Sequence, residues 1–424
     1  MRILIVNTSE QTGGAAVASK RLVMALNNNG EKAKMLVRDK STDNISIVAL
    51  PGGLKQRWHF LWERLRIYMA LKFNKDHLWE IDIANAGTDI TSLKEFKEAD
   101  VIHLAWINQG MLSLKGIEKI IRSGKPIVWT MHDLWPATAL CHYARGCDSF
   151  ITGCKNCQLL PDGGNEKDLS AKVWYRKKHI YSASNIHFVT CSRWLENQAK
   201  QSGLLHNMSV TSIPNAIDTN IFGPQDKAEA KRALGLPTDK NVILFVAQKV
   251  TDERKGARYL IEALNKLKEE NPEVANDCVV ALLGGHAEEL AKQIKMDVYP
   301  LGYVSGDKNI AKVYNAADIF VLPSMEDNLP NTLMEALACG VPCVGFNVGG
   351  IPEMIDNGKN GYVAKAGDTD DLKKGILWIL SEADHEALFH GCISKVSHCY
   401  SQQSVAMKYI EEYSRVMAQK GYGL

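Results

Sequence analysis

Two carboxylates in the second half of the chain, Asp327 and Glu335, have a spacing that lets both bind one ligand. The apolar run Ile319–Leu322 predicts a buried strand, and the residues from Pro330 onward predict a helix. Proline suits the first turn of a helix, because its missing N–H would be unpaired there anyway. Asp327 then lies on the loop before the helix, and Glu335 lies about two helical turns further along.

The start of this helix predicts a phosphate site. In a parallel sheet such helix starts face the crevice above the carboxyl ends of the strands, so the amides of Asn331 and Thr332 would point into it. Backbone N–H groups at a helix N-terminus attract anions, and carboxylates accept strong hydrogen bonds from sugar hydroxyls. The pattern therefore indicates a ligand with both phosphate and sugar hydroxyls. The alternative is an ordinary surface loop followed by a helix.

The first half of the chain carries two further candidate positions. A predicted strand at Ile3–Val6 is followed by Gly13 and Gly14 and then by an amphipathic helix. The glycines do not form a G-x-G-x-x-G dinucleotide fingerprint, and taken alone they indicate a turn. A second strand, Ile127–Thr130, leads to His132, which places this histidine at the carboxyl end of a parallel strand, where such sheets bind ligands.

Three segments resemble one known family. The stretch 324–355, SMEDNLPNTLMEALACGVPCVGFNVGGIPEMI, resembles the donor-site signature of retaining glycosyltransferases of family four, also called group 1. The family usually has Glu, seven residues and then Glu, and here Asp327 takes the first position and Glu335 the second. HDLWP, which begins at His132, resembles the acceptor-side strand end, and 212–222 resembles the interdomain segment.

The resemblance implies an α/β protein with the GT-B fold, in which two Rossmann-like domains face a central cleft. Alternating strands and helices along the chain favour parallel sheets independently of the resemblance. A length of 424 residues also suits two domains of about 200 residues each. We expect an acceptor-side domain at 1–217, a nucleotide-sugar-binding domain at 218–400, and a C-terminal helix at 401–424 that returns to the first domain.

The family also has Gly-Arg, a short gap and Lys-Gly after the first strand of the second domain. Lys255 and the following glycine match this pattern, whereas Gln248 stands in place of the arginine. A diphosphate leaving group needs cations, and lysine serves as a compact point charge. We expect either Lys249 or Arg254 to supply the second positive charge.

Each matched residue then acquires an expected role. Lys255 and the amides of Asn331 and Thr332 would stabilise the departing phosphate, and Glu335 would hold the ribose. Asp327 would orient the donor sugar, and His132 would contact that sugar from the first domain. In the family, a glycine loop closes over the donor phosphates, and Gly13 and Gly14 match this loop.

The leading hypothesis is a retaining, hexosyl-type glycosyltransferase that moves a sugar from a nucleotide diphosphate to an acceptor hydroxyl in polysaccharide or glycolipid synthesis. It requires no catalytic metal or other cofactor, because fixed positive groups replace the metal. The alternatives are a sugar-nucleotide epimerase of the same fold and a non-catalytic nucleotide-sugar binding protein. A P-loop hydrolase is poorly supported, because Gly124-Lys125 and Gly358-Lys359 lack the upstream glycine and the following Ser or Thr.

Four cysteines lie within 17 residues in a glycine-containing segment, namely Cys141, Cys147, Cys154 and Cys157. Four thiols this close could form a tetrahedral structural zinc site, although the spacing differs from that of standard zinc fingers. Free thiols or disulfides are the alternatives.

The segment Leu54–Phe73 predicts a helix that is both aromatic and basic. Apolar residues such as Trp58 and Trp62 recur at helical spacing, and basic residues such as Arg57 lie largely elsewhere on the helix. One interpretation is a helix packed against its own domain. The other is an interfacial helix in peripheral contact with a membrane that carries a lipid-linked sugar acceptor.

The composition, with 46% hydrophobic and 23% charged residues, is that of a soluble globular protein. A formal net charge of +2 gives no reason to expect nucleic acid as a partner. The N-terminus lacks the apolar core of a secretory signal, so we expect a cytoplasmic protein with mostly reduced cysteines, located in the alternative at the inner face of the membrane.

Overall fold

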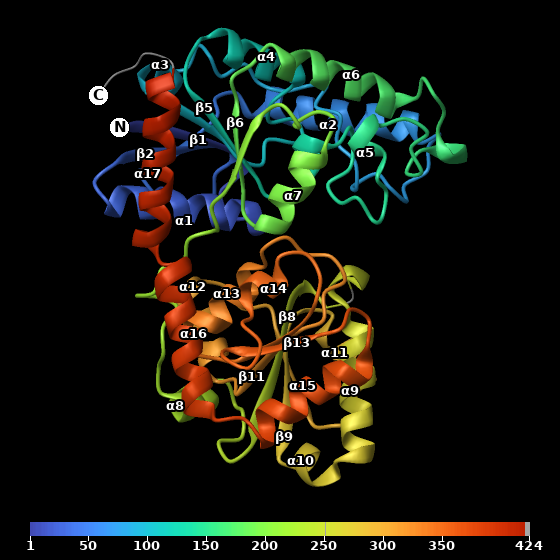
Figure 1. Ribbon diagram of the computed structural model, residues 1–424, viewed down its shortest axis with the longest axis vertical. Coiled ribbons are helices and arrows are strands. Elements are labelled where there is room, and N and C mark those ends of the chain that lie inside the picture. Colours follow the sequence, from blue (N-terminus) through green and yellow to red (C-terminus); the bar gives the residue numbers. More distant parts are fainter. Residues whose placement is uncertain (251, 420–424) are drawn as a thin grey trace. The chain divides into compact units, whose positions relative to one another are not determined.

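The computed structural model describes residues 1–250 and 252–419, which form two compact units (Figure 1). The N-terminal unit contains Met1–Ala216 and the segment from Val405 onward, and the C-terminal unit is Ile217–Ser404. The boundaries therefore fall at 216/217 and 404/405, where the sequence suggested 217/218 and 400/401.

The N-terminal unit is built on a seven-stranded parallel sheet with strand order β3-β2-β1-β4-β5-β6-β7. Its strands are β1 (Arg2–Ser9), β2 (Lys32–Asp39), β3 (Ile47–Ala49), β4 (Val101–Leu104), β5 (Ile127–Met131), β6 (His187–Thr190) and β7 (Ser209–Ser212). Side chains alternate between the two faces of β1: Ile3 and Ile5 belong to one apolar cluster, and Leu4 and Val6 to another. Both faces of the sheet are therefore buried, as expected for parallel strands.

Helices cover both faces of this sheet (Figure 1). They are α1 (Gly14–Asn28), α2 (Gly53–Ala70), α3 (Lys94–Glu98), α4 (Leu114–Arg122), α5 (Ser149–Thr152), α6 (Leu169–Ser182), α7 (Arg193–Gln201) and α17 (Gln402–Gln419), with the 3-10 turns η1 (Trp135–Ala137) and η2 (Pro161–Gly163). None of the helices formed by residues 1–250 and 252–419 combines the length and the hydrophobicity of a transmembrane segment.

The C-terminal unit repeats the architecture with a six-stranded parallel sheet in the order β10-β9-β8-β11-β12-β13. Its strands are β8 (Asn241–Lys249), β9 (Cys278–Gly285), β10 (Val298–Gly302), β11 (Ile319–Leu322), β12 (Cys343–Phe346) and β13 (Gly361–Ala364). Its helices are α8 (Lys227–Ala233), α9 (Ala257–Glu270), α10 (Pro272–Asn276), α11 (Ala287–Ala291), α12 (Asp307–Asn315), α13 (Asn331–Ala338), α14 (Ile351–Met354), α15 (Thr369–Ser381) and α16 (His385–Cys399), with the 3-10 turn η3 (Glu253–Lys255).

The strand order determines where each unit can bind a ligand. In both sheets the order reverses beside the first strand, between β1 and β4 and between β8 and β11. The loops at the carboxyl ends of these strands lead away on opposite faces and leave a crevice, which is where open parallel sheets bind their ligands. The functional residues of each unit are therefore expected on the loops that follow these strands.

The C-terminal helix packs on the N-terminal unit, as the sequence predicted. Tyr413 Oη lies 2.6 Å from His103 Nδ1, and Tyr409 Oη lies 2.9 Å from Thr130 Oγ1. Both tyrosines are buried in the apolar cluster that contains α1 and one face of the sheet. The helix thus completes a layer of the N-terminal unit.

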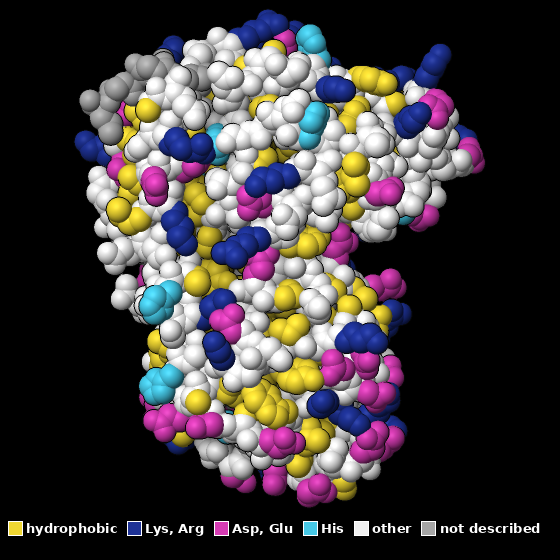
Figure 2. Space-filling model, viewed as in Figure 1, with side chains coloured by type: hydrophobic (Ala, Val, Ile, Leu, Met, Phe, Trp, Pro, Cys, Tyr) yellow, Lys and Arg dark blue, Asp and Glu magenta, His cyan; other side chains and the backbone are white. Residues whose placement is uncertain are grey.

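The helix at Leu54–Phe73 exists, but its packing differs from one interpretation of the sequence. As α2 it leaves Trp58, Leu61 and Leu65 exposed to solvent. The helix does pack against its own domain, but the buried residues are Gln56, Glu63, Arg64 and Ile67, and the apolar face is not among them. Elsewhere, the face shown in Figure 2 has acidic and basic side chains interspersed over both units.

Candidate functional site

Two loops of the C-terminal unit, after β8 and after β11, are joined to each other. Met325 N donates a hydrogen bond of 2.9 Å to Arg254 O. Gly256 has φ +71°, and a Cβ at this position would lie 1.8 Å from Pro323 O. Only glycine tolerates both this backbone conformation and this approach. The glycine therefore allows the basic segment to pack beside the end of β11.

This packing brings Lys255 to Asp327. Lys255 Nζ lies 2.6 Å from Asp327 Oδ2, and Arg254 Nη1 lies 3.9 Å from the same oxygen. Arg254 is held there by a hydrogen bond of 2.9 Å from Nη1 to Glu326 O. Burial opposes ionisation of Asp327, but the charges of Lys255 and Arg254 outweigh it and lower the pKa of the carboxyl below its usual value. Asp327 is therefore an ionised carboxylate between two cations.

The helix after this loop, α13, begins at Asn331, with Pro330 one residue before it as the N-cap. The sequence assigned Pro330 to the first turn, so the helix starts slightly later than expected. Proline has no side-chain acceptor to cap the first amides. Within the described residues, Thr332 Oγ1 is buried and makes no hydrogen bond. The start of α13 can therefore offer hydrogen-bond donors, among them the hydroxyl of Thr332, to a phosphate.

The turn after β12 fixes the backbone of the same loop. Gly350 N donates a hydrogen bond of 3.2 Å to Asp327 O. Gly349 has φ +56°, and a Cβ there would lie 1.7 Å from Asp327 O. Two glycines thus let a third loop close directly on the aspartate.

Glu335 lies on α13 and is 8% exposed. Its Oε2 accepts a hydrogen bond of 2.9 Å from Tyr314 Oη, and Tyr314 is fully buried on α12. Gln248 lies exposed near the end of β8, and the side chain of Lys249 lies outside the described part of the chain. Of the predicted donor-site residues, the structure joins Lys255, Arg254 and Asp327 directly.

In the N-terminal unit, Gly13 is the N-cap of α1 and Gly14 is its first residue. The loop before them is anchored at both ends. Ser9 Oγ accepts a hydrogen bond of 3.0 Å from Thr12 N, and the buried carboxylate of Glu10 pairs with Lys20 at 3.1 Å. Burial opposes the charge of Glu10, but its hydrogen bonds lower the pKa to about 2.

His132 follows β5, as predicted, and it is partly buried. Its Nδ1 lies 3.4 Å from Cys191 Sγ. It lines a cavity of about 10 Å³ together with His103, Thr130 and Tyr409. Burial lowers the pKa of His132 to about 4, and neighbouring Asp133 offsets only part of this effect. At neutral pH His132 is therefore an uncharged hydrogen-bonding group.

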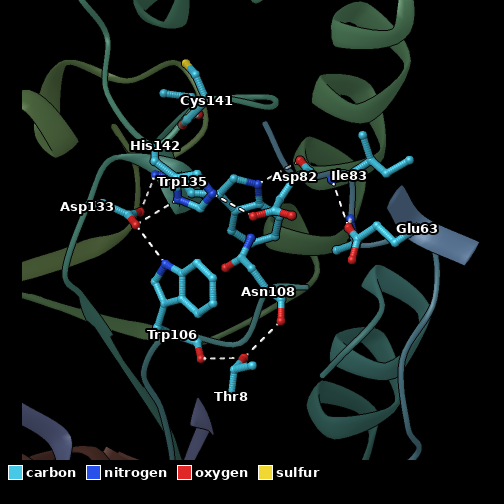
Figure 3. A network of polar contacts seen from close by, with 12 residues as sticks. Thr8, Glu63, Asp82, Ile83, Trp106, Asn108, Asp133, Trp135, Cys141 and His142 are labelled. Carbon is cyan, nitrogen blue, oxygen red and sulfur yellow. Dashed lines mark hydrogen bonds and ion pairs between the residues drawn. The ribbon is translucent and has the colours of Figure 1, made fainter. Parts of the chain in front are cut away.

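The next residue, Asp133, enters a buried network that sequence reasoning missed (Figure 3). Asp133 Oδ2 accepts a hydrogen bond of 2.9 Å from Trp106 Nε1 and lies 2.8 Å from His142 Nδ1. His142 Nε2 lies 2.7 Å from Asp82 Oδ2, and Arg64 pairs with the same aspartate. Burial disfavours the imidazolium, but the two carboxylates raise the pKa of His142 to about 10. The charged histidine thus connects the loop after β5 to α2.

Lys177 of α6 is bonded to the backbone of the same loop. Its Nζ donates hydrogen bonds of 2.6 Å to Trp135 O and 3.0 Å to Thr138 O, and it lies 3.3 Å from the centre of the Trp135 ring. Burial lowers the pKa of Lys177 to about 7. A sequence signal for such residues is an ionisable side chain inside an apolar run, and Asp82 between Ile81 and Ile83 is one example.

The clustered cysteines Cys141, Cys147, Cys154 and Cys157 are free thiols in the structure. Across residues 1–250 and 252–419, no group of three or more His, Cys, Asp or Glu side chains is arranged to hold a metal ion. The four thiols nevertheless lie near enough to one another to interact electrostatically, and the zinc site stays a prediction. Burial raises the pKa of Cys141 to about 11 and that of Cys154 to about 12, which favours the neutral thiols.

Comparison with known proteins supports a glycosyltransferase fold over the whole chain. Sucrose-phosphate synthase from Thermosynechococcus elongatus superimposes with a TM-score of 0.68 at 17% identity, covering 98% of this chain and 99% of the other. HepE of Anabaena in complex with UDP-glucose superimposes with a TM-score of 0.63 at 15% identity, covering 97% and 99%. These likenesses define the class: two Rossmann-like units of the GT-B type.

The family follows from the C-terminal unit, where residues 226–389 match the family described as glycosyl transferases group 1. This match covers the segment that carries the donor-site signature, so the resemblance noted in the sequence is confirmed for the C-terminal unit. N-acetyl-alpha-D-glucosaminyl L-malate synthase of Bacillus anthracis is 25% identical over 217 residues, or 50% of this chain. The match spans about half of that relative, 54% of its length.

Proposed function

We propose that this protein transfers a sugar from a nucleotide diphosphate to an acceptor hydroxyl. One observation carries the proposal: at the switch point of a unit that belongs to a glycosyltransferase family, Lys255, Arg254 and Asp327 meet beside a helix start. The HepE structure, which contains UDP-glucose, supports a donor of the same chemical class. Lys255, Arg254 and Asp327 lie where open parallel sheets bind their ligands, so each of these charged side chains can contact the donor.

The cations bind the diphosphate. Lys255 pairs with Asp327, so an incoming diphosphate competes with this carboxylate for the ammonium group. Once the diphosphate has taken Lys255, the carboxylate of Asp327 is available to accept a hydrogen bond from a donor hydroxyl. Glu335, held by Tyr314, accepts hydrogen bonds from the ribose.

In the transfer step, the bond between the anomeric carbon and the phosphate oxygen breaks, and the acceptor oxygen bonds to that carbon. The acceptor proton leaves with the nucleotide diphosphate. Negative charge grows on the departing phosphate, so Lys255 and Arg254 stabilise the transition state more than the ground state. These fixed cations take the part that a metal ion plays in other transferases.

We propose that the reaction retains the anomeric configuration, with the new bond formed on the face from which the phosphate departs. His132 is neutral at physiological pH and therefore contacts the donor sugar by a hydrogen bond, without charge. The acceptor is a sugar or a lipid-linked sugar in polysaccharide or glycolipid synthesis. Gly13 and Gly14 close the loop over the donor phosphates.

A panel of nucleotide sugars tests the proposal by thermal stabilisation. A ligand at a hundred times its dissociation constant adds about 2.7 kcal/mol, enough for a clear shift in Tm. We expect one donor class to stabilise the protein and to be consumed when acceptors are added. Conversion of donor to an epimer without acceptor would identify an epimerase. Binding without turnover against a broad acceptor panel would identify a nucleotide-sugar binder.

A further inference from the structure

Helix α2 turns a largely polar side to the protein, although Ile67 on the same side is fully buried in the apolar core. Gln56 and Glu63 are buried, and Arg64 is buried beside them. Gln56 Nε2 donates a hydrogen bond of 2.8 Å to Leu50 O, and Glu63 Oε1 accepts one of 2.6 Å from Ala84 N. Polar contacts therefore fix the helix on the N-terminal unit, and its apolar side is left outward.

The outward side is a continuous apolar stripe. It consists of Leu54 (84% exposed), Trp58 (64%), Leu61 (56%), Trp62 (39%), Leu65 (45%) and Met69 (41%). These positions recur every three or four residues, so they form one row along the helix at about 100° per residue. Trp58 and Trp62 stack with ring centres 6.4 Å apart. A contiguous exposed apolar row of this kind marks an interaction surface.

Basic side chains border the stripe on both sides. At about 100° per residue, Lys55 and Arg66 fall along one edge and Arg57 along the other, and all three are exposed. Arg66 lies 6.0 Å from the centre of the Trp62 ring. Within the described range Gly53–Ala70 the acidic residue is Glu63, which is buried. The exposed side of α2 is therefore apolar in the middle and purely cationic at its edges.

We propose that α2 lies flat on an anionic lipid surface, with the stripe at the level of the acyl chains and Lys55, Arg57 and Arg66 at the head groups. Tryptophan favours this interface, because its ring is apolar and its N–H is polar. Each basic residue near an anionic leaflet adds attraction that salt screens. The buried polar side means that docking requires no unfolding or rotation of the helix.

A second copy of the chain fits this surface less well. In a two-fold dimer built on the stripe, the same patch meets itself, so the basic edges of one α2 would face the basic edges of the other. An anionic membrane instead complements the middle and the edges together. If the protein docks on a membrane, its acceptor would be a lipid-linked sugar. This statement about the acceptor rests on the proposed function, whereas the docking itself does not.

Vesicle flotation with the full-length protein tests the docking. The probes are phosphatidylcholine vesicles with and without phosphatidylglycerol, at low salt and at about 1 M salt, where the Debye length is about 3 Å. We expect flotation with the anionic vesicles at low salt and release at high salt. At low salt, Arg57→Glu with Arg66→Glu should lower partitioning at least about tenfold, and Trp58→Ser with Trp62→Ser should lower it as well.

The controls carry comparable changes at exposed positions of the C-terminal unit. Lys292→Glu with Lys308→Glu reverses two charges, and Tyr303→Ser removes an exposed ring. We expect both controls to float like the wild type. Equal loss in the control variants, flotation with neutral vesicles alone, or no flotation of the wild type would overturn the proposal. The proposal would also be overturned if the wild type did not bind vesicles but formed a dimer that Trp58→Ser with Trp62→Ser dissociates.

Because flotation needs no donor, acceptor or turnover, its result is independent of the proposed reaction. A protein that floats but transfers no sugar would leave the docking surface intact and contradict the reaction. A protein that transfers sugar to a water-soluble acceptor but ignores vesicles would do the opposite.

Discussion

The Lys255–Asp327 pair is the residue-scale feature from which the proposed chemistry follows. Lys255→Ala should lower kcat by about a hundredfold or more and change the donor Kd much less, because charge on the leaving phosphate grows along the reaction. Lys308→Ala, an exposed lysine of the same unit, is the control and should have no effect. Steady-state rates and donor titrations separate the two constants. Normal turnover of Lys255→Ala would transfer the role to Lys249 or Arg254.

Glu335 makes a different kind of contact, because its proposed partner, the ribose, is present in the ground and transition states alike. Glu335→Ala should therefore raise the donor Kd. It should also lower the free energy of unfolding by about 1–3 kcal/mol, because Tyr314 Oη loses its buried acceptor. Glu335→Gln keeps an acceptor oxygen and should recover most of the stability. Calorimetric titration and denaturant unfolding measure the two effects, and unchanged donor affinity in Glu335→Ala would refute the assignment.

At the scale of elements, the junction between η3 and α9 depends on Gly256. Gly256→Ala places a Cβ 1.8 Å from Pro323 O, so the basic loop must move away from β11. We expect a loss of stability of several kcal/mol and a loss of donor binding. Gly358→Ala is the matched control, since its φ is +78° but a Cβ there meets nothing within 4 Å. Its cost should be limited to about 1 kcal/mol of backbone strain. Equal Tm values for the two variants would contradict this account.

The loop after β5 depends on the charge of His142, and this dependence can be measured by pH. The folded protein binds this proton more tightly, because the pKa rises from about 6.5 in an unfolded chain to about 10. The stabilisation is therefore complete below pH 6.5 and is lost as the pH rises through about 10. His142→Asn removes it and leaves the buried carboxylate of Asp133 without its cation, whereas Asp82 keeps Arg64, at a cost of about 3 kcal/mol near neutral pH.

The measurement is the difference in unfolding free energy between wild type and His142→Asn from pH 6.5 to pH 10, and it should shrink with rising pH. Lys177, whose pKa is lowered to about 7, acts with the opposite sign over a similar range. Because Lys177 is present in both proteins, its contribution largely cancels in the difference. A difference that stays constant across this range would show that His142 is uncharged in the folded protein.

The elements differ in how far the sequence predicts them. The strand Ile319–Leu322 is found with the predicted bounds, because a short apolar run between polar turns allows little else. Asp368 is the N-cap of α15, and its carboxylate accepts hydrogen bonds from the amides of Asp370 and Asp371, as expected for an aspartate directly before a helix. Local rules of this kind operate within a few residues of sequence.

Where contacts join distant segments, the sequence is less informative. The outward direction of the apolar stripe on α2 depends on Glu63 and Arg64 meeting residues near 82, and helical periodicity does not encode which side faces inward. The pairing of Lys255 with Asp327 spans 72 residues and requires both loops to be in place. The family signature identified both residues, but the ion pair between them was visible only in the fold.

At the scale of the whole molecule, the N-terminal unit is completed by the last helix of the chain. Val405, Tyr409, Tyr413, Val416 and Met417 of α17 are buried in the cluster formed with α1 and the sheet. Burial of each is worth about 1.5–3 kcal/mol, so together they contribute roughly 8 kcal/mol or more. That is comparable to the whole stability of an average domain, about 5–15 kcal/mol.

A chain that ends before Gln402 should therefore lose the folded N-terminal unit and keep the C-terminal one, whose core contains no residue of α17 among those described. Limited proteolysis with mass spectrometry should show cleavage throughout residues 1–216 and protection of the C-terminal sheet. Tyr413→Phe, which removes one hydroxyl beside His103, is a milder test and should cost about 1 kcal/mol. If the shortened chain protects both units equally, α17 adds little, and the N-terminal sheet is stable with one of its layers missing.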